Sequence, residues 1–235
     1  MKFKRHMEEV MMRCRPTKRL IDILLSSLLL LVFFPVFILV SFAILLLEGR
    51  PVFYISKRYV TTAKQVRIPK FRTMVRDATS EKYQLNSRFM REGYLDIPLS
   101  CEVYTGIGRV LEKTQIVELL QLLLVLRGDM SFIGNRPLPQ GNINELIKFQ
   151  NWHERFDAPA GITGIAQVVG KYGLEPEERL ELERLYGQVY KEGRVLKCDL
   201  LILACTANLL LRGKLLPITK ARALLMSCIP GFDDL

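Results

Sequence analysis

The chain has 235 residues, which suffices for one ordinary domain with a membrane segment but excludes two well-grown domains beside it. Hydrophobic residues make up 49% of the chain although 25% of its residues are charged, and the formal net charge is +10. Five cysteines without a close CxxC pair argue against a disulfide framework or a zinc site, and they indicate reduced cytosolic thiols.

The apolar residues gather near the N-terminus. Residues 20–47 contain a single charged side chain, Asp22, and a helix needs about 20 apolar residues to cross a bilayer. The apolar run is too long for a secretory signal, and no cleavage site of small residues follows it. We therefore expect a membrane anchor that stays attached.

The flanks of this run are both rich in lysine and arginine, which short cytosolic loops favour. Pro35 stands near the middle, where proline removes a backbone hydrogen bond and bends a helix. We predict a re-entrant membrane helix hairpin at residues 20–48 with both ends in the cytosol. An ordinary spanning helix that tolerates its proline is the alternative.

The net charge suits either nucleic acid or an anionic membrane surface. Because the chain carries an anchor, we expect the membrane lipid surface as its partner and no nucleic acid.

The rest of the chain is expected to be mainly α with a small β-hairpin, a monotopic cytosolic domain held at the membrane. Two short β-prone segments, 52–56 and 65–68, predict the hairpin. Residues 200–211 are apolar but too short to span, so they are expected to be buried core or an interfacial helix. Length and spacing predict helices at 103–113, 116–126, 142–150, 175–190 and 196–211. The predicted divisions are a basic segment 1–19, the membrane helix 20–48, the cytosolic domain 49–213 and a C-terminal tail 214–235.

Lys70 and Arg72 follow the second β-prone segment, and in extended backbone they point the same way. Two aligned cations suit a phosphate. Cations that snorkel at the lipid surface would show the same pattern.

Glu118 lies in a segment that is apolar apart from Gln121, three residues further on and on the same helix face. A buried carboxylate without a partner costs several kcal/mol or becomes neutral, so a cation, a metal or a ligand is implied. Alternatively, Glu118 sits in a first turn and complements the helix dipole.

Two further segments that contain glycine turns are candidates for binding an anion. Residues 128–137 present Arg136 after a glycine turn, and residues 160–167 end at Gln167. Glycine turns let backbone approach an anion closely, although most are simply turns.

In this order and spacing, the segments resemble the bacterial sugar transferase family, the small monotopic phosphoglycosyl transferases. The resemblance extends over nearly all of residues 18–213. The residues that carry it include Lys18, Arg19, Asp22, Gly49, Pro51, Arg58, Lys70, Phe71, Arg72, Gly106, Gly108, Arg109, Glu118, Gln121, Gly128, Asp129, Gly134, Arg136, Pro137, Gly161, Gly164, Gln167, Tyr186 and Asp199.

The resemblance implies a site on the cytosolic face of the bacterial inner membrane, at the first membrane step of glycan or exopolysaccharide assembly. A phosphosugar passes there from a UDP-sugar to a polyprenyl phosphate, usually undecaprenyl phosphate, with Mg²⁺ required. In the family an aspartate attacks the sugar-bearing phosphate, and the following glutamate, here Glu118, helps hold the metal. The substrate-binding residues expected on this basis are Lys70, Arg72, Arg109, Arg136 and Gln167.

The sequence departs from the family at the nucleophile. Where the family reads Leu-Asp-Glu-Leu-Pro-Gln-Leu, residues 116–122 read Ile-Val-Glu-Leu-Leu-Gln-Leu, so Val117 takes the place of the aspartate. Valine has no lone pair with which to attack phosphorus. Further departures are Ser56 for glutamine, Val60 and Ala63 for glycine, Glu112 for arginine, and Asn135 for proline.

Two hypotheses follow. The first is an active phosphoglycosyl transferase that relies on Glu118, or on direct attack by the lipid phosphate, and it is favoured by the retained cations. The second is a catalytically impaired homologue that binds the membrane and its ligands as a partner or regulator of other glycan-assembly enzymes. Val117 and Glu112 favour the second, and the sequence leaves enzyme activity open.

Overall fold

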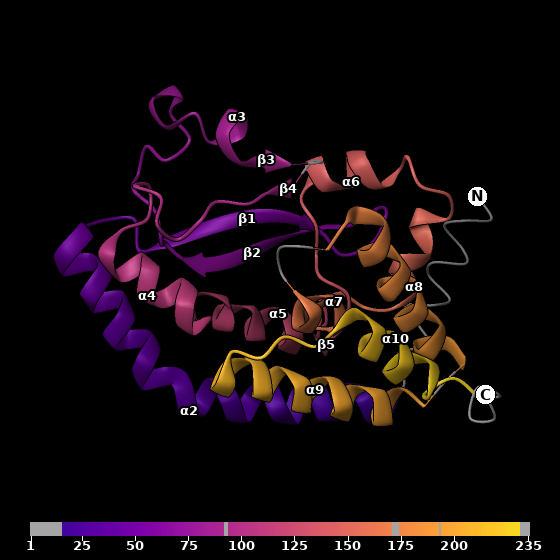
Figure 1. Cartoon of the computed structure of the whole chain (residues 1–235). Helices are drawn as coiled ribbons and strands as arrows, with labels where there is room; N and C mark the ends of the chain where they lie inside the picture. Colours follow the sequence, from indigo (N-terminus) through magenta and orange to yellow (C-terminus); the bar gives the residue numbers. More distant parts are fainter. Residues whose placement is uncertain (1–15, 92–93, 171–173, 193, 231–235) are drawn as a thin grey trace.

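The computed structural model describes residues 16–91, 94–170, 174–192 and 194–230, so most of the predicted basic segment lies outside it. Its longest element is helix α2 (Pro16–Glu48), which has Pro35 in its interior and bends along its length in Figure 1. Among the described residues, α2 is the one helix long and apolar enough to cross a membrane. The expected apolar helix is therefore present, but as one continuous bent helix over Pro16–Glu48 and not as a helix hairpin.

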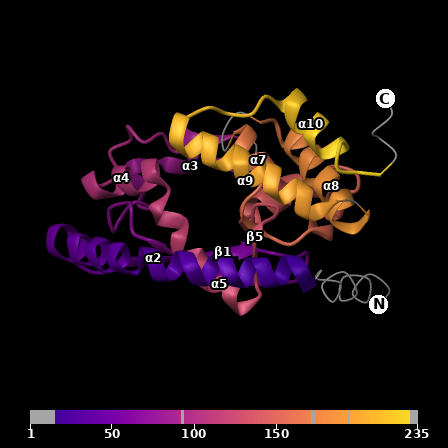
Figure 2. The ribbon, with the colours of Figure 1, turned by 90° about the horizontal axis from the view of Figure 1, so that it is seen from below.

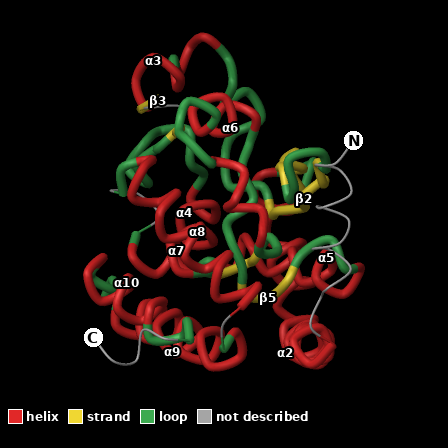
Figure 3. The backbone as a smooth tube through the Cα atoms, turned by 90° about the vertical axis from the view of Figure 1, so that its right-hand side faces the viewer, coloured by secondary structure: helices red, strands yellow, loops and turns green. Residues whose placement is uncertain are grey.

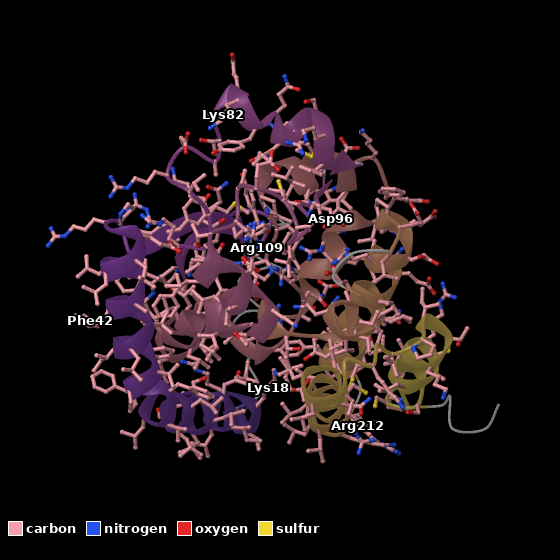
Figure 4. All side chains as sticks on the ribbon, turned by 60° about the vertical axis from the view of Figure 1, so that its left-hand side comes forward. Lys18, Phe42, Lys82, Asp96, Arg109 and Arg212 are labelled. Carbon is pink, nitrogen blue, oxygen red and sulfur yellow. The ribbon has the colours of Figure 1, made fainter. Side chains whose placement is uncertain are left out.

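Most side chains of α2 are exposed, in contrast to the core of the domain. Leu31, Phe34 and Leu39 are at least 60% exposed, although water would penalise such surface. Figure 4 shows Phe42 projecting from α2 away from the rest of the molecule. A helix with this surface is consistent with a membrane anchor.

A β-hairpin follows α2, as predicted, with longer strands than the sequence indicated. Strands β1 (Phe53–Tyr59) and β2 (Gln65–Phe71) pair antiparallel, with Tyr54 opposite Lys70. Two further pairs are short: β3 (Met90–Arg91) with β4 (Tyr94–Leu95), and the parallel pair β5 (Ser131–Ile133) with β6 (Gly161–Thr163).

The remaining described elements are helical. The predicted helix 116–126 is instead a 3-10 turn (Ile116–Gln121) followed by α5 (Leu122–Arg127). The left-handed conformation of Gln115 separates this segment from the preceding helix. The other elements are α3 (Leu85–Phe89), α4 (Gly106–Thr114), α6 (Gln140–Leu146), α7 (Ile165–Val169), α8 (Pro176–Glu192), α9 (Val195–Arg212), α10 (Ile218–Met226) and 3-10 turns at Glu81–Tyr83 and Trp152–Asp157.

Helix α9 combines the two roles considered for its apolar stretch. Cys198 and Ile202 are buried in the main core with α7, α8 and α10, whereas Leu200 and Leu211 are exposed. Figures 2 and 3 show α9 and α2 running along the same side of the molecule. Both helices on that side carry exposed apolar residues.

Candidate functional site

Glu118 is the centre of the candidate site, and its side chain is almost completely buried, with the residue 6% exposed. Its Oε1 accepts hydrogen bonds from Lys70 Nζ and from Arg136 Nη2, each at 3.1 Å. Arg136 Nη1 lies 3.5 Å from Oε2. The partner that the apolar surroundings require is thus a pair of cations.

Three separate segments build this contact. Lys70 comes from β2, Glu118 from the 3-10 turn that packs against β2, and Arg136 from the loop after β5. That loop lies very close to the segment before β6, since a Cβ on Gly134 would lie 2.2 Å from the carbonyl oxygen of Pro159. Glycine is therefore required where the Arg136 loop begins.

Arg58 adds a third cation, which the sequence reasoning did not single out as a site residue. Burial lowers the pKa of its guanidinium, the charge of Arg136 lowers it further, and Glu118 acts in the opposite direction. Its Nε donates to Ser56 Oγ at 2.8 Å. The observed register of the hairpin places Arg58 on the same face as Lys70. The predicted first strand ended at residue 56, so the sequence carried no signal for this.

We call Arg58, Lys70, Arg136 and Glu118 the Glu118 cluster. Three cations surround a single carboxylate in it, so its net charge is positive. Partly buried cations attract anions more strongly than exposed ones, because solvent screens them less. The cluster is chemically suited to phosphate groups.

Val117 lies next to Glu118 in the chain but belongs to the apolar core. It is 1% exposed and packs in a cluster with Ile44 of α2, Phe71, Leu111 and Leu120. The position expected for the nucleophile is thus occupied by a side chain that holds the 3-10 turn against α2.

The other expected substrate-binding residues lie apart from the Glu118 cluster or make other contacts. Arg72 follows the last residue of β2, and its Nη2 donates to the carbonyl oxygens of Glu48 (3.0 Å) and Gly49 (3.1 Å) at the end of α2. Arg109 Nε donates to the carbonyl oxygen of Leu99 at 3.0 Å. Within the described chain, the buried side-chain amide of Gln167 has no hydrogen-bond partner.

A metal site is not formed by these side chains. The described residues contain no group of three or more His, Cys, Asp or Glu placed to hold a metal ion. Glu118, the expected ligand, already accepts hydrogen bonds from Lys70 and Arg136. As arranged, the cluster does not fit a resident Mg²⁺.

A second buried polar network ties the first half of α2 to the domain. Lys18 Nζ contacts Asp199 Oδ2 at 2.6 Å, and Tyr186 donates to Asp199 Oδ1 at 2.6 Å. Asp22, the charged residue of the apolar run, accepts from Ser131 Oγ at 2.7 Å. Burial raises the pKa of Asp199, although Lys18 and Tyr186 act to lower it.

The sequence is similar to known proteins over most of its length. The bacterial sugar transferase family matches residues 13–213. The uncharacterized sugar transferase EpsL of Bacillus subtilis is 35% identical over 170 residues, covering 72% of this chain and 76% of EpsL. The exopolysaccharide production protein ExoY of Rhizobium meliloti is 29% identical over 175 residues, covering 73% and 76%.

A longer relative carries a more specific name. The UDP-glucose:undecaprenyl-phosphate glucose-1-phosphate transferase of Klebsiella pneumoniae is 31% identical over 193 residues, covering 80% of this chain but 39% of that protein. The family match covers most of the sequence, including α2 and every residue of the Glu118 cluster. The chain belongs to the bacterial sugar transferase family.

Proposed function

We propose that this protein acts in the transfer of a phosphosugar from a UDP-sugar to undecaprenyl phosphate, at the cytosolic face of the bacterial inner membrane. The observation that carries the proposal is the Glu118 cluster, in which Arg58, Lys70 and Arg136 converge from three segments of the chain. The names of relatives such as the Klebsiella pneumoniae transferase support the choice of substrates.

The cluster is suited to bind the diphosphate of a UDP-sugar. Lys70 and Arg136 each present N–H donors, and hydrogen bonds between ionised partners are about twice as strong as neutral ones. Before the nucleotide arrives, Glu118 holds both cations in place. Arg72, Arg109 and Gln167 stay predicted contacts from the family resemblance.

In the proposed transfer, a phosphate oxygen of undecaprenyl phosphate attacks the sugar-bearing phosphorus directly. The new bond joins that oxygen to phosphorus, the bond from phosphorus to the bridging oxygen breaks, and UMP leaves. The cations stabilise negative charge on the transferred phosphoryl group. No step is assigned to Mg²⁺, because the side chains around Glu118 do not form its site.

A binding role without turnover is the second candidate, and the burial of Val117 favours it. A protein that retains the cations but lacks the nucleophile would still hold a UDP-sugar or undecaprenyl phosphate at the membrane. Such a protein would act as a partner or regulator of other glycan-assembly enzymes.

We also propose that α2 is re-entrant, with both ends on the cytosolic face. Lys18 near its start pairs with Asp199, and Arg72 binds the carbonyl oxygens at its end. The contact of Lys18 is buried, the contact of Arg72 is partly buried, and both partners lie outside α2 in the chain that follows it. A spanning arrangement would separate one end of α2 from its partners.

A turnover assay separates the two candidates. Purified protein in lipid nanodiscs is incubated with undecaprenyl phosphate, Mg²⁺ and a panel of UDP-sugars, and UMP release is measured. We expect UMP only when both substrates are present, because direct transfer needs no covalent intermediate. A stoichiometric burst from UDP-sugar alone would contradict this route, and UMP at background with intact UDP binding would establish the binding role.

Val117→Asp extends the assay, alone and combined with Glu112→Arg. We expect Val117→Asp to unfold at a lower temperature than Val117→Asn, because a carboxylate in the apolar cluster loses its hydration. A variant that gains a UMP burst would show instead that residue 117 can turn toward the Glu118 cluster.

A further inference from the structure

A fully buried ion pair contacts the backbone of Arg136. Arg155, in the 3-10 turn Trp152–Asp157, donates from Nε to Glu183 Oε2 of α8 at 2.6 Å. Their side chains are 1% and 0% exposed. Burying two charges is costly unless further hydrogen bonds satisfy them, so the other contacts of this pair show what it holds.

The other hydrogen bonds of this pair involve Arg136 itself and the residue before it. Arg155 Nη2 donates to the carbonyl oxygen of Arg136 at 2.8 Å. The side-chain amide of the preceding residue, Asn135, donates to the carbonyl oxygens of Arg155 (2.6 Å) and Glu183 (3.0 Å). The backbone of Arg136 is therefore fixed at its carbonyl and through the residue before it.

We propose that Asn135, Arg155 and Glu183, here called the support cluster, position Arg136 against Glu118 and thereby set the affinity of the site for phosphate groups. This inference rests on the proposed function. The three are positioning residues, since Arg136 is the member of this chain of contacts that reaches the Glu118 cluster.

Asn135 makes the support cluster specific to this chain. The family resemblance places a proline at this position, and proline offers neither a side-chain donor nor a backbone N–H. Here the Asn135 side chain donates twice, and its backbone N–H donates to the carbonyl oxygen of Pro159 at 2.9 Å. The departure from the family pattern thus supplies hydrogen bonds to the segment that presents Arg136.

Two variants separate positioning from general stability. Arg155→Lys keeps a positive charge for Glu183 but loses the planar fork that also reaches Arg136. Asn135→Ala removes both amide hydrogen bonds. The matched control is Asn142→Ala, because Asn142 of α6 is also buried and its Nδ2 has no hydrogen-bond partner in the described chain.

The experiment measures UDP binding by isothermal titration calorimetry, together with the melting temperature, for detergent-solubilised full-length protein. We expect Arg155→Lys and Asn135→Ala to weaken UDP binding by about tenfold, the order of one misplaced charged hydrogen bond, and Asn142→Ala to bind like the parent. In an Arg136→Ala background, Arg155→Lys should cause no further loss. The inference would be overturned if Arg155→Lys reduced UDP affinity equally in the parent and in the Arg136→Ala background. It would also be overturned if Arg155→Lys bound UDP like the parent.

A second readout keeps the inference separate from the proposed function. If the parent fails to bind UDP, the proposed function fails, but the support cluster still predicts an effect on the ion pair between Arg136 and Glu118. A double-mutant cycle of Arg136→Ala and Glu118→Gln, read by unfolding, should show coupling in the parent. The coupling should fall in the Asn135→Ala and Arg155→Lys backgrounds, and unchanged coupling in both would refute positioning.

Discussion

Glu118 shows how a single buried carboxylate organises its surroundings. Its ion pairs reach back 48 residues to Lys70 and forward 18 residues to Arg136. The apolar sequence around Glu118 predicts that some partner exists. It does not predict which, because the partners meet only when the hairpin and the β5 loop have folded onto the 3-10 turn.

Removal of the individual cations tests the roles that the geometry gives them. We expect Lys70→Ala and Arg136→Ala to weaken UDP binding by about 1.5 to 3 kcal/mol, the value of a charge-assisted hydrogen bond. Arg72→Ala is expected to act mainly on stability, because Arg72 binds the end of α2. Its melting temperature should fall, and its UDP affinity should change less than that of Lys70→Ala or Arg136→Ala. Calorimetric titration and thermal unfolding give both quantities.

The matched control for these variants is Lys57→Ala, since Lys57 is an exposed cation on the opposite face of the same hairpin. If Lys57→Ala weakens UDP binding as much as Lys70→Ala, general surface charge rather than the Glu118 cluster binds the nucleotide.

At the scale of elements, the sequence predicts what depends on local pattern. Apolar length predicts α2, and two short β-prone segments predict the hairpin β1–β2. The parallel pair of β5 and β6 was not predicted, because three-residue strands joined across a long connection leave no periodic signal. The convergence of Lys70 and Arg72 on one site was expected from strand alternation, but β2 ends at Phe71 and Arg72 turns toward α2.

The ion pair between Lys18 of α2 and Asp199 of α9 leads to a prediction at this scale. Lys18→Met leaves the buried carboxylate of Asp199 without its cation, which should cost about 3 to 5 kcal/mol of unfolding free energy. The double variant Lys18→Met/Asp199→Asn removes the charge as well, so it should recover much of this loss. Thermal unfolding at several pH values measures both.

The pH dependence follows from the raised pKa of Asp199 in the folded state. A carboxyl group with a raised folded pKa contributes stability below its unfolded pKa and loses it as the pH rises through the folded pKa. Because Lys18 acts to lower this pKa, its loss in Lys18→Met raises the pKa of Asp199 further, so the deficit of Lys18→Met should be smaller at about pH 5 than at about pH 8. The double variant has no titratable group at residue 199 and should lack this pH dependence. A deficit independent of pH would mean that Asp199 does not carry the penalty.

At the scale of the whole molecule, α2 and α9 run along one side (Figure 3), and both helices carry exposed apolar residues. Two members of the Glu118 cluster, Arg58 and Lys70, lie on the hairpin that follows directly from the end of α2. If a membrane contacts α2 and α9, the phosphates of its lipids lie at the boundary between the bilayer and the domain. Both ends of α2 would remain with the domain on the cytosolic side.

Accessibility labelling tests this arrangement in intact bacterial cells. We expect cysteines introduced as Lys4→Cys and Lys64→Cys to escape a membrane-impermeant maleimide outside intact cells, and to react with it after permeabilisation. Reaction of Lys4→Cys in intact cells would contradict the re-entrant anchor. Pro35→Leu should straighten α2 and expose Lys4→Cys in part of the population, because the bend no longer favours return to the same face. Adding Lys18→Met should increase that fraction, since a spanning helix must first break the ion pair between Lys18 and Asp199.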